Sequence, residues 1–109
     1  LMKDAANKFS DIIEKVRFND PKIPVIHNVD SLVETSPEKI KVKLIEQIYK
    51  PVRWLDTINS MLKMKVNTII ECGPSKVLCS LIKRISPETE TIDLDSFNNY
   101  VNLYNAKKT

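Results

Sequence analysis

Glycine is nearly absent from this sequence: Gly73 is the one glycine among 109 residues, where about 7% would be average. Phosphate-binding loops and repeats built on glycine turns are therefore excluded. Histidine is equally rare, with His27 alone. Since there is also no Gly-x-Ser-x-Gly elbow, no Walker loop and no cluster of metal ligands, the sequence does not contain a complete active site of a known motif class.

Cysteine and long apolar runs are also scarce. Cys72 and Cys79 have the spacing of neither a redox pair nor half of a zinc site, and two thiols do not make a disulfide framework. The apolar runs, such as residues 66–72, are far shorter than the roughly 18 residues of a membrane span. No charged-then-apolar signal segment opens the chain. We therefore expect a cytoplasmic protein without a membrane partner.

The charge balance is only mildly basic. Seventeen Lys and Arg against fourteen Asp and Glu give a net charge of +3, which is compatible with an acidic partner. Nucleic acid is a poor candidate because the basic residues are scattered and the chain has only three Phe, three Tyr and one Trp for base stacking. The length allows one domain or a piece of one.

Apolar spacing predicts four helices and a fifth near the end of the chain. Steps of three and four residues predict an amphipathic helix over residues 2–16. Ser36 and Pro37 predict the start of a second helix, which runs to about Tyr49. Pro51 must end or bend it and can open a third helix. The remaining two are expected after Gly73-Pro74-Ser75 and after Asp95 as a cap, with residues 107–109 frayed.

Three short β-branched runs predict strands over residues 24–29, 68–72 and 91–93. Strands that alternate with helices indicate the α/β class, with a parallel sheet and helices packed on its faces. Gly73 directly follows the second run, at the edge where open α/β sheets bind ligands and where the next helix presents free amides. The alternative is a tight turn that needs the conformational freedom of glycine.

Two further features have a functional and a structural interpretation. Lys83 and Arg84 end a predicted helix, where they could dock an acidic partner or simply stabilise the helix C-terminus. His27 could be a base or a ligand, but it has no nucleophile motif nearby and we expect a structural role. From the residues alone, a stand-alone α/β binding module that docks an acidic protein without catalysis remains an alternative.

Several segments together have a recognisable order and spacing. They are Leu1-Met2-Lys3, Pro24-Val25-x-x-Asn28-Val29-Asp30, Gln47-Ile48-Tyr49-x-Pro51-Val52-x-Trp54 and Glu71-x-Gly73-Pro74-x-Lys76-Val77-Leu78. In this order and with nearly ungapped spacing, they resemble the C-terminal third of the bacterial malonyl-CoA:acyl carrier protein transacylases. The resemblance runs from Leu1 to about Ile85 and fades afterwards.

The resemblance implies both a fold and an activity. Residues 1–109 would be the C-terminal part of the large, hydrolase-like α/β subdomain of an acyltransferase, with the catalytic elbow and the small subdomain outside this chain. The complete enzyme, expected to be a monomer, would transfer malonyl from coenzyme A to the phosphopantetheine thiol of acyl carrier protein through an acyl-serine intermediate in fatty acid biosynthesis. Malonyl-CoA and the carrier protein would be substrates, with no bound cofactor or metal.

The resemblance also assigns site residues. The nucleophilic serine and the basic histidine would lie upstream of Leu1, so the 109-residue piece is expected to be inactive by itself. The backbone carbonyl of Gln47 would accept the Nδ1 proton of that histidine and fix its tautomer, the role of the aspartate in a protease triad. Lys83 and Arg84 would dock the acidic carrier protein.

Overall fold

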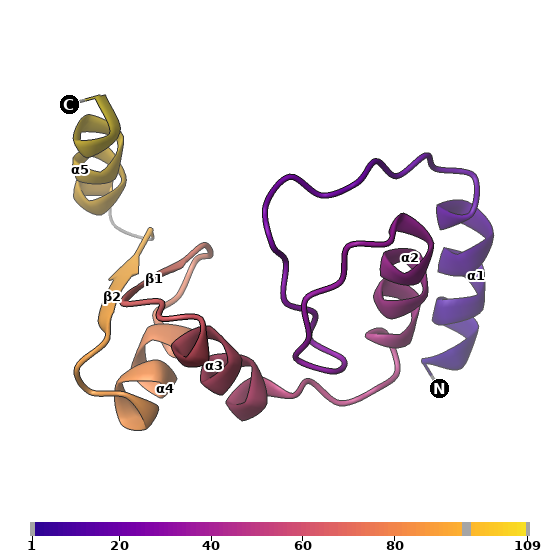
Figure 1. Cartoon of the computed structure of the whole chain (residues 1–109), viewed down its shortest axis with the longest axis horizontal. Coiled ribbons are helices and arrows are strands. Elements are labelled where there is room, and N and C mark those ends of the chain that lie inside the picture. Colours follow the sequence, from indigo (N-terminus) through magenta and orange to yellow (C-terminus); the bar gives the residue numbers. More distant parts are fainter. Residues whose placement is uncertain (1, 95–96, 109) are drawn as a thin grey trace. The chain divides into compact units, whose positions relative to one another are not determined.

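The computed structural model describes residues 2–94 and 97–108 of the chain. In chain order the elements are α1 (Lys3–Ile13), α2 (Pro37–Glu46), α3 (Trp54–Lys63), β1 (Thr68–Glu71), α4 (Val77–Ile85), β2 (Glu90–Asp93) and α5 (Phe97–Lys108). They form two compact units, Leu1–Ser60 and Met61–Thr109, and Figure 1 shows the helices and strands of each. No helix in the described ranges is long and apolar enough to cross a membrane.

In the first unit, α1 packs against α2 (Figure 1). The buried residues of α1 are Ala6 and Ile13, which lie about two turns apart on the same face of the helix. The helix ends earlier than predicted, because the amides of Lys15 and Val16 bond to carbonyls three residues back at 3.2 and 3.1 Å. This tightened last turn ends the helix at Ile13 and leaves Val16 exposed.

The start of α2 agrees with the sequence prediction. Ser36 has an extended backbone, with φ −78° and ψ 120°, and its side chain accepts a hydrogen bond from the amide of Lys39 at 3.4 Å. Pro37 occupies the first helical turn, where the missing N–H costs nothing. The helix itself ends at Glu46, and the next residues continue as turns.

The predicted strand over residues 24–29 is wrong. The segment is irregular and contains one isolated antiparallel bridge, between Ile26 and Val33. Asp30 forces the reversal: its Oδ1 accepts the amide of Leu32 at 3.1 Å, which is the hydrogen bond of an Asx turn. Ser31 follows with a φ of 59°. The chain therefore folds back locally, and the β-branched residues of this run do not pair in a sheet.

The third helix starts at Trp54 and not at Pro51 as predicted. The amide of Arg53 donates to the carbonyl of Asn28 at 2.9 Å, and the carbonyl of Arg53 accepts the amide of Thr57 at 2.9 Å. Arg53 is thus the residue at which the chain leaves the loop and enters the helix, which delays the start of the helix until Trp54.

The second unit is built on a strand–helix–strand unit. β1 and β2 are parallel, with Thr68 opposite Glu90 and Glu71 opposite Asp93. α4 contacts both strands (Figure 1) and buries Ile82 completely. The predicted α/β class and its parallel sheet are therefore confirmed, with two strands in the described part of the chain. The assignment of residues 1–109 to part of a larger subdomain stays a prediction.

The last helix, α5, runs to Lys108, so the expected fraying from residue 107 is wrong for the described part of the tail. Asn99 ties this helix to the end of β2, because its side-chain amide donates to the carbonyl of Asp93 at 2.9 Å. The predicted capping residue Asp95 lies outside the described residues.

Candidate functional site

The carbonyl of Gln47 lies just beyond the end of α2 and has no hydrogen-bond donor within the described ranges. The amide of Gln47 donates to Lys43 at 3.0 Å, and the amide of Lys50 donates to Glu46 at 2.9 Å. The next donor in this series would be residue 51, which is a proline and has no N–H. Proline at position 51 therefore removes the helical donor of the Gln47 carbonyl, at the residue that the resemblance singles out.

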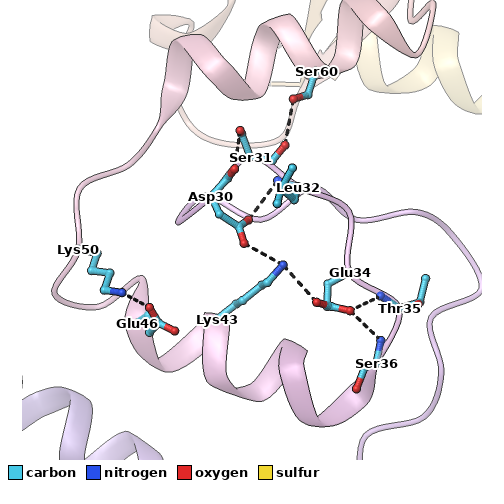
Figure 2. A network of polar contacts seen from close by, with 10 residues as sticks. All are labelled: Asp30, Ser31, Leu32, Glu34, Thr35, Ser36, Lys43, Glu46, Lys50 and Ser60. Carbon is cyan, nitrogen blue, oxygen red and sulfur yellow. Dashed lines mark hydrogen bonds and ion pairs between the residues drawn. The ribbon is translucent and has the colours of Figure 1, made fainter.

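An ion-pair cluster lies one turn before Gln47 (Figure 2). The ammonium of Lys43 contacts Asp30 Oδ2 at 2.8 Å and Glu34 Oε1 at 3.3 Å. The Lys43 side chain is only 13% exposed. A cation that has lost most of its water needs such partners, and here two carboxylates supply them. Sequence reasoning missed this cluster, because the acidic residues lie 9 and 13 positions before the lysine.

The pKa values of the three groups reflect this arrangement. Burial opposes the charge of Lys43, but its hydrogen bonds to Asp30 and Glu34 outweigh burial and raise the pKa of the ammonium. Burial likewise raises the pKa of Asp30, whereas Lys43 and the amide of Leu32 more than reverse this and lower it. The amide of Ser36, with Lys43 and the amide of Thr35, lowers the pKa of Glu34. All three groups are therefore held in their charged forms.

His27 lies close to this cluster and is only 5% exposed. Its backbone is engaged on both sides, since its amide donates to Leu32 at 3.1 Å and its carbonyl accepts from Ser31 at 2.8 Å. Its Nε2 has no partner among the residues that the structure describes. Burial and the charge of Lys43 lower the pKa of the imidazole, against the opposing charges of Asp30 and Glu34. A buried, neutral imidazole fits the structural role expected for this residue.

In the second unit, two of the amides at the start of α4 are already hydrogen-bonded within the chain. The carboxylate of Glu71, at the end of β1, accepts the amides of Leu78 at 3.2 Å and Cys79 at 2.9 Å. These bonds, that of Cys79 foremost, lower the pKa of Glu71 although burial opposes the shift. The helix terminus proposed for a ligand therefore binds the chain's own carboxylate.

Of the two interpretations of Gly73, the tight turn that needs glycine is not supported by its geometry. Gly73 does not have a positive φ, so the turn does not need glycine's conformational freedom. A Cβ built at this position meets nothing within 4 Å, so no close approach requires glycine either. The residue that organises this edge is Glu71. Its position, at a strand end just before a helix, is a signal that sequence reasoning could have used, since anions are favoured at helix N-termini.

Lys83 and Arg84 lie in the last turn of α4. Lys83 donates to the carbonyl of Thr89 at 2.7 Å, and Thr89 directly precedes β2. The pair is therefore at the edge where the strands begin, whereas Gly73 follows the end of β1. Lys83 is bound to its own loop, while Arg84 is exposed and forms no ion pair with any described residue.

Gln47 belongs to the first compact unit and the basic pair to the second. Across residues 2–94 and 97–108, no group of three or more His, Cys, Asp or Glu side chains has an arrangement that could hold a metal ion. The first unit offers a backbone carbonyl as a hydrogen-bond acceptor with an ionic cluster one helical turn before it. The second unit offers an exposed arginine.

The chain is similar to malonyl transacylases in both sequence and structure. No protein-family model matches the chain. The malonyl CoA-acyl carrier protein transacylase of Bacillus subtilis is 44% identical over 92 residues, which cover 84% of this chain and 29% of the relative. The transacylase of Haemophilus influenzae is 41% identical over 101 residues, which cover 90% of this chain and 32% of the relative.

Solved structures have the same fold over this segment. An acyl carrier protein S-malonyltransferase from Vibrio cholerae is 40% identical with a TM-score of 0.85, covering 93% of this chain and 33% of that one. A malonyl-transacylase in complex with a type II PKS acyl-carrier protein is 33% identical with a TM-score of 0.88, covering 96% of this chain and 34% of that one. This chain thus spans about a third of the proteins that it matches.

Proposed function

Because the chain is related to the malonyl CoA-acyl carrier protein transacylases and matches about a third of their length, we propose that the protein containing it transfers malonyl groups from coenzyme A to acyl carrier protein. The observation that carries this proposal is identity above 40% over most of the chain to transacylases of two different bacteria. The transfer would serve fatty acid biosynthesis.

The proposed reaction has two halves. A serine oxygen attacks the thioester carbon of malonyl-CoA, the carbon–sulfur bond breaks, and coenzyme A leaves as the thiol with a proton passed on by a histidine. The phosphopantetheine thiol of the carrier protein then attacks the malonyl-serine ester and restores the serine hydroxyl. In this proposal, both serine and histidine come from a part of the protein that precedes this segment.

This segment would contribute the Gln47 carbonyl to the site. As an acceptor for the Nδ1 proton, a carbonyl keeps Nε2 free to take the proton of the serine and stabilises the imidazolium that results. Pro51 has no N–H, and no other described residue donates to the Gln47 carbonyl, which supports this role. The side chain of Gln47 is not needed for it, because the acceptor is a backbone atom.

Carrier-protein docking is proposed for the basic pair of α4, with Arg84 as the principal contact. Arg84 is exposed and has no ion pair with a described residue, whereas Lys83 is already bound to Thr89. Lys83 would then contribute charge without leaving its loop. Long-range attraction of this kind mainly raises the association rate for an acidic partner.

The function is tested with the complete protein that contains this segment. The protein is incubated with malonyl-CoA and phosphopantetheinylated acyl carrier protein, and the mass of the carrier protein is measured by mass spectrometry. A gain equal to one malonyl group, dependent on the enzyme, supports the proposal. A carrier protein that stays unmodified, while the enzyme is folded and malonyl-CoA is intact, contradicts it.

A further inference from the structure

The loop of residues 28–34 fixes α2 through the side chain of Lys43. The ammonium contacts Asp30 at 2.8 Å and Glu34 at 3.3 Å (Figure 2). Charge-assisted hydrogen bonds of this type are about twice as strong as neutral ones. The Lys43 side chain is mostly buried, so losing the contact would leave an uncompensated charge, which is costly in a protein interior.

The two carboxylates are themselves held in place by backbone amides. Asp30 Oδ1 accepts the amide of Leu32 at 3.1 Å. Glu34 Oε2 accepts the amides of Thr35 and Ser36 at 3.1 and 3.2 Å. Each carboxylate thus uses one oxygen for the loop and the other for Lys43. Lys43 is therefore anchored to a rigid part of the loop and not to two freely rotating side chains.

The same lysine is hydrogen-bonded to Gln47 through its backbone. The carbonyl of Lys43 accepts the amide of Gln47 at 3.0 Å. One helical turn, about 5.4 Å along the axis, separates the anchored residue from the free carbonyl. A tilt or shift of α2 at Lys43 would therefore move the Gln47 carbonyl with it.

The other end of the connection from α2 to α3 is attached to the same loop. The amide of Arg53 donates to the carbonyl of Asn28 at 2.9 Å. The hydroxyl of Ser60, on α3, donates to the carbonyl of Ser31 at 2.9 Å (Figure 2). Residues 47–53 are thus fixed at both ends by the loop of residues 28–34, and Lys43 provides the side-chain contact at the Gln47 end.

From these contacts we propose that Lys43 is a positioning residue: its ion pairs with Asp30 and Glu34 hold the end of α2 and so direct the Gln47 carbonyl at the catalytic imidazole. This inference rests on the function proposed above. Lys43 does not touch the substrate or the reacting atoms, and it acts through the backbone of Gln47. A small displacement of such a group can cost up to about a hundredfold in rate.

The test compares Lys43→Met with Lys39→Met in the complete protein. Lys39 is on the same helix one turn earlier, is exposed and forms no ion pair with a described residue, so the same substitution there is a matched control. We expect Lys43→Met to lower kcat about tenfold or more, with little change in the KM for malonyl-CoA. Lys39→Met should leave both unchanged. Lys43→Arg, which keeps the charge, should restore most of kcat.

The pH profile separates positioning from a general loss of stability. A displaced carbonyl no longer stabilises the imidazolium, so the pKa of the catalytic histidine falls and the acid limb of kcat/KM moves to lower pH. His27 would respond in the opposite direction, because the charge of Lys43 lowers its pKa and Lys43→Met removes that charge. A protein that is merely less stable loses amplitude without a shift of the limb.

Amide hydrogen exchange gives a readout that does not depend on activity. In Lys43→Met, we expect faster exchange at the amides of Gln47 and Lys50 than in Lys39→Met. If exchange is faster but the wild-type protein transfers no malonyl, the proposed function is wrong and the positioning role falls with it. If malonyl transfer is normal in the wild type, and neither exchange nor the acid limb changes in Lys43→Met, the positioning role alone is overturned.

A second substitution covers the case in which Lys43→Met does not fold. Glu34→Gln keeps the side-chain length and an oxygen acceptor but removes one of the two charges that bind Lys43. We expect a smaller fall in kcat and a shift of the acid limb in the same direction. A folded Glu34→Gln protein with the wild-type pH profile and wild-type exchange at Gln47 would also overturn the inference.

Discussion

Pro51 stands four residues after Gln47, at the position whose N–H would otherwise close the next helical hydrogen bond onto the Gln47 carbonyl. The preceding bond in the series, from the amide of Lys50 to Glu46, is made at 2.9 Å. Proline has no N–H, so the donor that would follow in this series is missing at the carbonyl of Gln47. The proposed role of Gln47 uses this backbone carbonyl, so it is compatible with an exposed side chain.

The first prediction follows from this relationship. In the complete protein, Pro51→Ala should lower malonyl transfer more than Gln47→Ala does, because alanine at position 51 supplies an N–H that competes for the carbonyl, whereas Gln47→Ala keeps the carbonyl. Steady-state turnover of the two variants, at equal folded fractions, provides the comparison. A loss in Gln47→Ala larger than that in Pro51→Ala would show that the glutamine side chain itself is required.

The second prediction concerns Glu71, which caps the start of α4. Glu71→Gln should lower the melting temperature at neutral pH, since a neutral amide is a weaker acceptor for the amides of Leu78 and Cys79. The pKa of Glu71 is lowered in the folded state. Its stabilisation is therefore present above the ordinary pKa of a glutamate, about 4.3, and is lost as the pH falls through the lower, folded-state pKa.

The measurement for Glu71 is thermal unfolding of wild type and Glu71→Gln across neutral and acidic pH. The difference in melting temperature should shrink toward acid. Glu90→Gln is the control, because Glu90 is exposed and its carboxylate forms no ion pair with a described residue. A difference for Glu71→Gln that stays constant with pH would mean that the charge of the carboxylate does not stabilise α4.

The third prediction concerns Lys65, which has a φ of 63°. Its amide bonds to Leu62 at 3.0 Å and the next amide bonds to Met61 at 3.1 Å, the pattern of a Schellman motif with a left-handed residue that is usually glycine. A left-handed L-residue costs about 1–2 kcal/mol. We therefore expect Lys65→Gly to stabilise the protein by about 1 kcal/mol, seen as a higher denaturant midpoint.

The control for this prediction lies two residues earlier, at the last residue of α3. Lys63 ends α3 in a helical conformation, so Lys63→Gly should lower the denaturant midpoint, because glycine costs about 0.5–1 kcal/mol in a helix. If both substitutions shift the midpoint in the same direction, the left-handed conformation of Lys65 is not the source of strain.

The fourth prediction separates the two basic residues of α4. Arg84→Glu should raise the KM for acyl carrier protein at low salt and much less at high salt, because exposed charges are screened over about 10 Å at 0.1 M. The KM for malonyl-CoA should change less. Lys83→Met should instead lower the melting temperature, since it removes the hydrogen bond to Thr89.

Lys76→Glu is the matched control for Arg84→Glu, because Lys76 precedes the other end of the same helix and is also exposed. It should leave the KM for the carrier protein close to that of the wild type. Equal effects of Lys76→Glu and Arg84→Glu would point to net charge alone. An effect of Arg84→Glu that persists in high salt would argue against electrostatic docking.

Local features of this fold are readable from the sequence because they depend on neighbours in the chain. Ser36 and Pro37 set the start of α2, since capping and a preset φ act within one turn. The strand–helix–strand order of residues 68–93 follows from the change in apolar spacing. The free carbonyl of Gln47 also follows from sequence, because a proline four residues later removes its donor wherever the helix lies.

Contacts between residues far apart in the sequence could be identified only from the tertiary structure. The run at residues 24–29 has the composition of a strand, but a strand needs a partner, and the Asx turn at Asp30 folds the chain back instead. The amides at the start of α4 could have bound a ligand, but the carboxylate of Glu71 accepts hydrogen bonds from two of them. The sequence determined which polar groups were available for hydrogen bonds and ion pairs. The packing of the chain decided which of them pair, because such contacts form only between groups that lie close together in space.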